Sequence, residues 1–167
     1  HACVPESERR FRTKIELALE MVRHARENGL HYGWVGADAG YGKGAGFCLA
    51  LEEMGETFVV DVHSDFHVYL KDPKPYLPEK AGNAGRPFTK YQSHQKSVEV
   101  GDLVNSLPAR SWKTMMLRKT TRGVLKVRIW RIRVYVWDGE SERVHRWDLI
   151  VTKSLGLSLI HISEPTR

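Results

Sequence analysis

A glycine-rich stretch between two apolar segments constrains the fold of this chain more than any other feature. Four glycines fall within residues 36–44, which excludes a regular helix or strand there and predicts a loop with tight turns. The apolar residues 31–37 before it predict a short buried strand, and residues 45–54 after it have helical spacing. The β-branched residues 57–63 predict a second strand. This order implies a parallel strand pair with a crossover helix, as in an α/β fold.

A helix is predicted before this unit. Thr13 and Glu16 have the spacing of a capping box, in which each side chain satisfies a free backbone N–H of the first turn. An apolar stripe follows at helical spacing, and Gly29 is placed to end the helix.

The character of the chain changes after residue 70. Three prolines within residues 72–78 exclude a helix or a central strand, and residues 79–97 stay polar, which predicts a loop. Residues 98–107 have a weak strand pattern, and strands dominate from 112 to 152. This part is therefore predicted to be β-rich.

Two alternating segments within the β-rich part are out of phase. Residues 125–129 alternate apolar and basic side chains, and residues 132–136 alternate aliphatic side chains with Arg133 and Tyr135, but the phase changes across Trp130 and Arg131. A β-bulge or a bend is predicted there. Asp138 and Gly139 predict a turn into a last strand.

Asp38 is the candidate catalytic residue, because it follows the first predicted strand at its carboxyl end. Functional groups gather at this end of the strands in open α/β sheets. A carboxylate there suits Mg²⁺, which prefers oxygen ligands and usually takes one or two from the protein. The residues alone leave an alternative open, in which Asp38 only caps the following turn.

A basic stretch in the β-rich part suggests a nucleic-acid partner, as does the net charge of +6. An ordinary solvated strand face is the alternative. The glycines near Lys43 fit no phosphate-loop pattern, although Lys43 itself is placed to touch a DNA phosphate. The candidate DNA-contacting residues are all basic: Lys43, Arg118, Lys119, Arg122, Lys126, Arg128, Arg131 and Arg133.

The remaining metal-ligand types form no strong pattern. Cys3 and Cys48 lack metal spacing, and Cys48 is predicted to be a small buried hydrophobe. His63 and His67 are four residues apart, which suggests a zinc site. A predicted turn at Asp65 separates them, so this is the weaker interpretation. Asp61 is predicted to form an ion pair with a basic side chain on a neighbouring β-strand.

Two segments resemble the middle of DDE transposases from bacterial insertion sequences, residues 11–21 and 34–42. In that family an Asp-x-x-Tyr-Gly stretch at a strand end carries the second catalytic aspartate, and Asp38 to Gly42 matches it residue by residue. Residues 61–65 and 146–151 are also similar to these proteins.

The resemblance implies a ribonuclease H-like core that presents Asp, Asp and Glu to metal ions, with a β-rich insertion before the Glu. We therefore expect a partial ribonuclease H-like catalytic core in residues 1–70 and a β-rich insertion region in residues 71–154. Residues 155–167 are expected to be a non-native tail, because residues 157–167 resemble a translated adaptor oligonucleotide. Asp38 would bind Mg²⁺ or Mn²⁺ in the complete enzyme.

The implied activity is DNA cleavage and strand transfer by Mg²⁺-dependent phosphoryl transfer at transposon ends and target DNA. The chain begins at His1 rather than Met, and residues 1–12 contain no Asp for the first catalytic position. Glu164 lies in the expected tail and is not taken for the catalytic Glu. We therefore expect an internal fragment that is inactive alone.

The resemblance also implies a bacterial cytoplasmic protein with no membrane partner, and a homodimer as one form of the complete protein. Two other functions remain open from the sequence. One is a non-catalytic DNA-binding remnant of a mobile element. The other is a metal-dependent nuclease unrelated to transposition, for which Asp61 or Asp65 would supply a further carboxylate.

Overall fold

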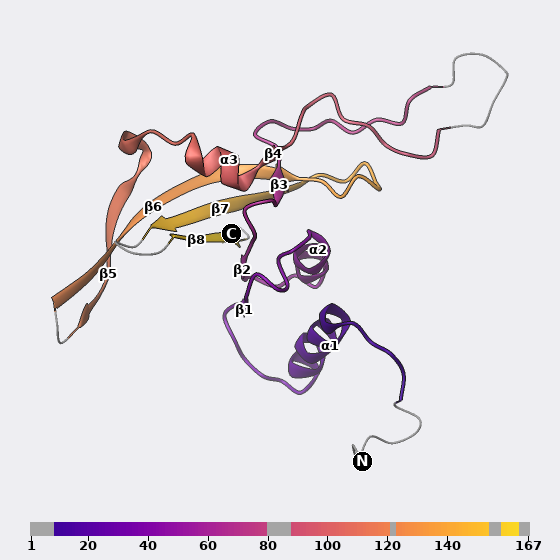
Figure 1. Ribbon diagram of the computed structural model, residues 1–167. Helices are drawn as coiled ribbons and strands as arrows, with labels where there is room; N and C mark the ends of the chain where they lie inside the picture. Colours follow the sequence, from indigo (N-terminus) through magenta and orange to yellow (C-terminus); the bar gives the residue numbers. More distant parts are fainter. Residues whose placement is uncertain (1–8, 80–87, 121–122, 154–157, 164–167) are drawn as a thin grey trace. The chain divides into compact units, whose positions relative to one another are not determined.

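The computed structural model describes residues 9–79, 88–120, 123–153 and 158–163, with the side chains of 118–125 and 158–163 left out. The chain forms two compact units, residues 1–33 and 34–167, and each is described by itself (Figure 1).

In its described residues 9–33, the first unit contains one helix, α1 (Lys14–Glu27), and the predicted capping box is confirmed. The Thr13 hydroxyl accepts a hydrogen bond from the Glu16 backbone N–H at 3.2 Å, and the Glu16 carboxylate accepts one from the Thr13 N–H at 2.6 Å. These bonds lower the pKa of Glu16, the Thr13 backbone bond contributing most. Gly29 follows the helix with a φ of 71°, as predicted. None of the described helices is both long and apolar enough to cross a membrane.

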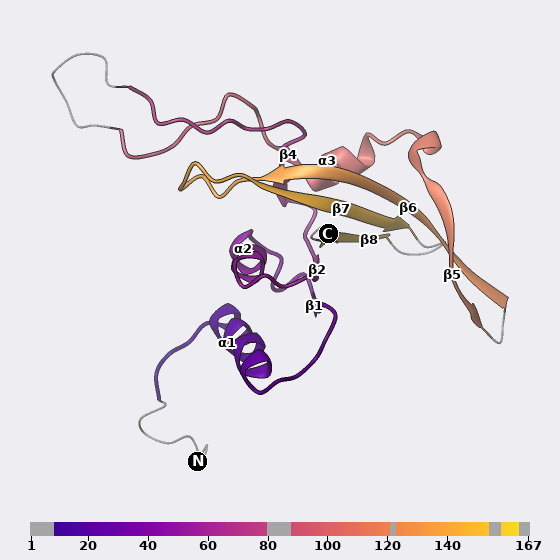
Figure 2. The same cartoon turned by 180° about the vertical axis from the view of Figure 1, so that it is seen from behind.

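The second unit begins with the predicted strand–helix–strand motif. β1 (Val35–Ala37) and β2 (Phe58–Asp61) are parallel neighbours, and α2 (Gly46–Glu53) connects them (Figure 2). The prediction of a buried strand over residues 31–37 is wrong in part, because β1 has three residues and none of them is buried.

Strands from both sides of residue 70 belong to one six-stranded sheet, in the order β1-β2-β8-β7-β6-β5. All neighbours beyond the β1–β2 pair are antiparallel. The architecture is mixed helix and strand, consistent with an α/β fold. The later strands are β5 (Lys113–Thr120), β6 (Gly123–Val136), β7 (His145–Lys153) and β8 (Ser158–Ser163).

A second sheet has two short strands, β3 (His67–Val68) and β4 (Val98–Glu99). The weak pairing predicted for residues 98–107 is therefore right only for its first two residues. The chain then forms α3 (Val100–Asn105) and the 3-10 helix η2 (Ala109–Ser111).

Of the bulge or bend predicted in β6 at Trp130 and Arg131, the bulge is wrong. The pairing of β6 with β7 is continuous from Arg128, opposite Lys153, to the end of β6, and the irregularity lies in β5 instead. The apolar pattern changes phase because β6 buries different faces along its length. Arg131 and Arg133 continue the face that is apolar at residues 125–129, and they pair with a buried carboxylate on the next strand.

The predicted turn at Asp138 and Gly139 is confirmed. Gly139 has a φ of 82°, and the Asp138 side chain accepts a hydrogen bond from the Glu140 N–H at 2.8 Å. The turn joins β6 to β7, so the strand predicted after it is confirmed.

Trp147 on β7 is the largest fully buried side chain in the described part of the chain. Its ring meets Phe58 of β2 edge-on, with 5.6 Å between centroids. Its indole N–H donates to the Glu52 carboxylate of α2 at 3.2 Å, and the same carboxylate bonds His145. The crossover helix is therefore fastened to the antiparallel strands by both packing and hydrogen bonds.

Asp148, the neighbour of Trp147, is only 3% exposed and carries a charge on the other face of the sheet. Its carboxylate accepts hydrogen bonds from Arg131 at 2.6 Å and from Arg133 at 3.3 Å. Burial acts to raise the pKa of Asp148, but the arginine hydrogen bonds and charges outweigh it, so the pKa is lowered.

We expect Trp147→Ala to lower the free energy of unfolding by about 3–5 kcal/mol, because it leaves a large cavity and removes the bond to Glu52. Met116→Ala, at an exposed apolar position, should change it by less than about 0.5 kcal/mol. Urea denaturation followed by circular dichroism measures both variants. Equal effects would contradict the packing described.

We expect Asp148→Asn to lower stability at neutral pH by about 1.5–3 kcal/mol, since charged hydrogen bonds are lost. The folded pKa of Asp148 lies below its unfolded value, so its stabilisation is present above the ordinary aspartate range and is lost as pH falls through the folded pKa. The difference between wild type and variant should therefore shrink in acid. Unfolding curves at a series of pH values test this, with the exposed Asp102→Asn as control.

Candidate active site

Asp38 is the first residue after β1, at the carboxyl end of the parallel pair. The last paired residues are Ala37 and Val60, so Asp38 and Asp61 follow side by side on neighbouring strands. Asp38 is exposed and Asp61 is half-buried. The structure thus places Asp38 where the sequence predicts it, and it brings Asp61 next to it.

The loop after Asp38 folds back onto this residue. The Asp38 Oδ1 atom accepts a hydrogen bond from the Gly40 N–H at 2.9 Å, and the Asp38 carbonyl accepts one from the Tyr41 N–H at 3.0 Å. Asp38 therefore caps its turn, as one of the two sequence interpretations expected. A carboxylate offers about four lone-pair positions, so a capping bond does not prevent a metal from binding the same group.

Gly42 controls how the loop crosses the end of β2. A Cβ atom on Gly42 would lie 1.9 Å from the Asp61 carbonyl oxygen, and 3.1 Å from a methyl group of Val60. Gly42 does not have a positive φ, so it is needed here for close approach rather than for its backbone freedom. The contact ties the Asp38 loop to Asp61, a link for which the glycine itself is the only signal in the sequence.

The donors at this edge suit a hard cation in type but are few in number. Among the residues that the structure describes, no group of three or more His, Cys, Asp and Glu side chains is arranged to hold a metal ion. Asp65, the other carboxylate near the end of β2, is exposed in the turn at residues 64 and 65. Two carboxylate side chains are compatible with Mg²⁺, which usually completes its shell with water and phosphate oxygens.

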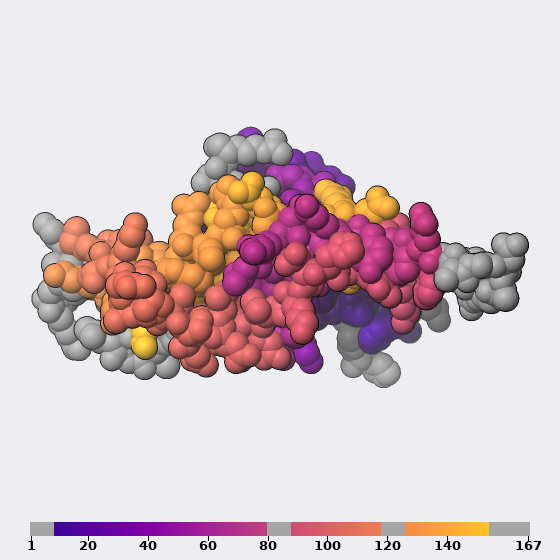
Figure 3. Space-filling model, turned by 90° about the horizontal axis from the view of Figure 1, so that it is seen from above, coloured from indigo at the N-terminus to yellow at the C-terminus, as the bar shows by residue number. Residues whose placement is uncertain are grey.

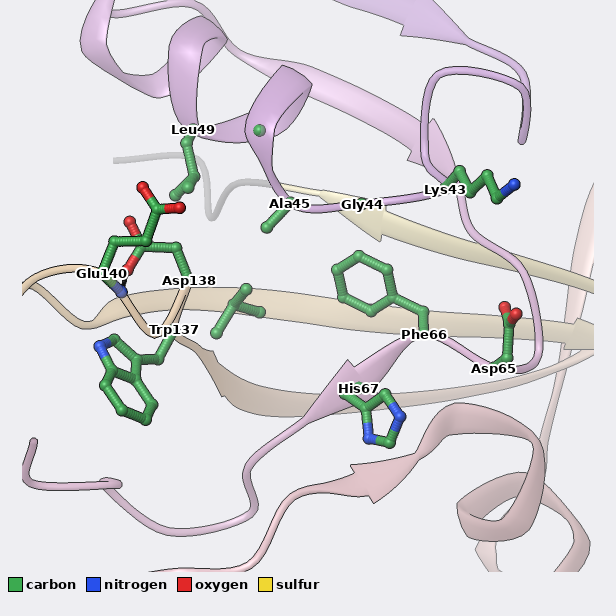
Figure 4. A pocket seen from close by; sticks show the side chains of 12 residues that line it. Lys43, Gly44, Ala45, Leu49, Asp65, Phe66, His67, Trp137, Asp138 and Glu140 are labelled. Atoms are coloured by element: carbon green, nitrogen blue, oxygen red, sulfur yellow. Dashed lines mark hydrogen bonds between the residues drawn. The ribbon is translucent and has the colours of Figure 1, made fainter. Parts of the chain in front are cut away.

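A pocket of about 480 Å³ lies beside the start of α2 (Figure 4). Phe66 and Leu49 form apolar parts of its wall, and the carboxylates of Asp138 and Glu140 gather at one end. Lys43 lies at the opposite end. Lys43 is exposed, five residues after Asp38, so its predicted phosphate contact stays a prediction.

The two histidines that suggested a zinc site lie close to the two-stranded sheet: His67 is in β3, and His63 is in the segment before it. The His67 Nδ1 atom lies 3.2 Å from the Ser97 hydroxyl, and Nε2 lies 3.9 Å from the Glu99 carboxylate. His63 is exposed just after β2. No metal-binding group of three forms around them in the described residues.

The predicted basic contacts fall into three groups. Arg131 and Arg133 are ion-paired with Asp148. Lys126 and Arg128 are exposed on β6. The side chains of Arg118 and Lys119, and all of Arg122, lie outside the described residues.

Cys48 is buried in α2, as predicted. Burial raises the pKa of its thiol to about 12. The thiol is therefore protonated at neutral pH, which fits a small buried hydrophobe.

Comparison with known proteins identifies the family. Residues 1–124 match the family model described as DDE superfamily endonuclease. The match covers well over half of the chain, so the protein belongs to this family, and the resemblance to DDE-type transposases is confirmed. No curated protein matches the chain. No solved structure matches it either. The family implies DNA as substrate, and its nucleases generally use divalent metals.

We expect Gly42→Ala to lower the free energy of unfolding by about 1–3 kcal/mol, because the new methyl group would overlap the Asp61 carbonyl. Gly44→Ala is a matched control two residues away, since nothing lies within 4 Å of the place that its methyl group would take and its φ is not positive. That variant should keep or slightly raise stability. Chemical denaturation measures both, and an equal response would argue against the close approach.

Proposed function

We propose that this protein is part of a transposase that acts on DNA by metal-dependent phosphoryl transfer, with Asp38 as a metal-binding catalytic carboxylate. The observation that carries the proposal is the position of Asp38 in an Asp-x-x-Tyr-Gly stretch at the carboxyl end of β1. Membership of the DDE superfamily endonuclease family supports the reaction class.

The β1–α2–β2 unit would be part of a ribonuclease H-like core. Its parallel strand pair and crossover helix support this assignment, since they align the ends of two strands at one edge. The strands after residue 70 would then be the family's β-rich insertion.

Asp38 and the adjacent Asp61 would hold Mg²⁺ or Mn²⁺. The metal, when bound, polarises the phosphodiester and activates water or a 3′-hydroxyl. The protein's own residues supply orientation: the Gly40 N–H fixes one Asp38 oxygen, and Gly42 fixes the loop against Asp61. Two carboxylates on neighbouring strands would also favour binding of a cation at this edge.

The chain alone would not cleave DNA. The described residues contain no third donor at this edge, and a metal held by so few ligands would be bound weakly. The same observation favours a second candidate function, a non-catalytic DNA-binding remnant of a mobile element. The two differ in whether Asp38 matters for metal binding.

DNA would be contacted through phosphates, which gives salt-dependent affinity with little sequence preference. We assign these contacts to Lys43 near Asp38 and to basic residues of β5, β6 and the segment between them. The latter are Arg118, Lys119, Arg122, Lys126, Arg128, Arg131 and Arg133.

We expect Asp38→Asn to abolish the weak Mg²⁺ and Mn²⁺ binding that titration calorimetry should detect for wild type, because it removes one charge while an amide still fits the turn. Asp72→Asn is the matched control: Asp72 is exposed and accepts the same local bond, from the Lys74 N–H at 2.9 Å, but follows no strand of the six-stranded sheet. It should leave metal binding intact. Wild type that binds no metal, or an Asp38 variant that binds as well as wild type, would favour the remnant.

A further inference from the structure

The β6–β7 ladder contains two contrasting charged pairs. Arg133 lies directly opposite Asp148, which is an opposite-charge pair. Arg128 lies directly opposite Lys153, which is a like-charge pair. These pairs occupy opposite faces of the sheet, because their positions on β6 are an odd number of residues apart in a continuous register.

Like charges directly opposite each other destabilise an antiparallel pair. Arg128 and Lys153 are both exposed, and neither forms an ion pair with a carboxylate in the part of the chain that the structure describes. Residues 109–136 contain no acidic residue to offset them. The ladder therefore contains a like-charge pair that no acidic residue of this segment offsets.

Trp112 brings the two cations to one ring. The Arg128 guanidinium and the Lys153 ammonium each lie 5.9 Å from the centroid of the Trp112 ring. Arg128 also donates a hydrogen bond to the Ala109 carbonyl of η2 at 3.2 Å. An aromatic ring within about 6 Å attracts a cation, so Trp112 offsets part of the repulsion and limits where both charges lie.

We propose that Trp112, Arg128 and Lys153 form a contact site for the phosphate backbone of duplex DNA. Lys126, two residues before Arg128, lies on the same face and extends the positive surface. The segment that contains η2 is drawn in salmon beside the orange strands in Figure 3. A phosphate bound by both cations would relieve their repulsion.

This inference rests on the proposed function only for the identity of the partner, which is DNA. β2 and β8 separate β1 from β7 and β6 in the sheet, so the site is distinct from Asp38. Arg131 and Arg133 share the Asp148 carboxylate on the other face of the sheet, so they are not part of this site. Lys153, which is part of it, was not among the residues predicted from the sequence.

Fluorescence anisotropy of the full chain with a labelled 20-base-pair duplex, in EDTA and across a KCl series, tests the site. Lys153→Gln should weaken binding severalfold and reduce the slope of log K against log salt by about 0.9, as expected for one lost phosphate contact. Arg146→Gln is the matched control, since Arg146 is an exposed cation on the same strand that also lies 5.9 Å from an aromatic ring, Tyr135. It faces the opposite side and should leave the slope unchanged.

Two further measurements separate a binding role from a structural one. The melting temperature of Lys153→Gln should stay the same or rise, because a like-charge contact is removed. Trp112→Leu keeps both charges but loses the ring, and it should weaken DNA binding at low salt.

Equal salt slopes for Lys153→Gln and Arg146→Gln would overturn the site, as would wild type that binds phosphatidylglycerol vesicles but not duplex DNA. Failure of the proposed function has a different signature. In that case Asp38→Asn and wild type bind Mg²⁺ alike, while the Lys153 effect on the DNA salt slope persists.

Discussion

The burial of Trp147 holds the second unit together. Its ring packs against Phe58 of the parallel pair, and its N–H reaches Glu52 on the crossover helix. A single side chain thereby links β7, β2 and α2. The loop that carries Asp38 leads into α2 and contacts the end of β2, so its position depends on these elements. The site depends on this link because β1 is short, has no buried residue and contributes little burial of its own.

The sequence predicted the elements whose signals are local. The capping box at Thr13, the glycine after α1, and the alternation of strand, loop, helix and strand all depend on neighbours within a few residues. The phase change in β6 was misinterpreted because its cause is distant in sequence. Arginines occupy one face there since Asp148, on the next strand, pairs with them.

The candidate site, like the fold, was predicted only where its signals are local in sequence. The position of Asp38 followed from the pattern of elements and from the family resemblance, and its capping bond was one of two expected roles. The neighbour Asp61 and the close approach of Gly42 required the strand register, which no local pattern encodes. Lys153 was overlooked because it lies far along the chain from Arg128, although the ladder sets them opposite each other.

β5 ends the sheet order, and it carries three consecutive apolar side chains, Met115, Met116 and Leu117, that are all exposed. A terminal strand of this kind has backbone amides and carbonyls available to a strand from another molecule, which promotes self-association at high concentration. The irregular pairing after Met116 and the basic residue Lys113 work against such stacking. Self-association of the purified protein should therefore depend more on the edge strand β5 than on the other edge strand, β1, which has three residues.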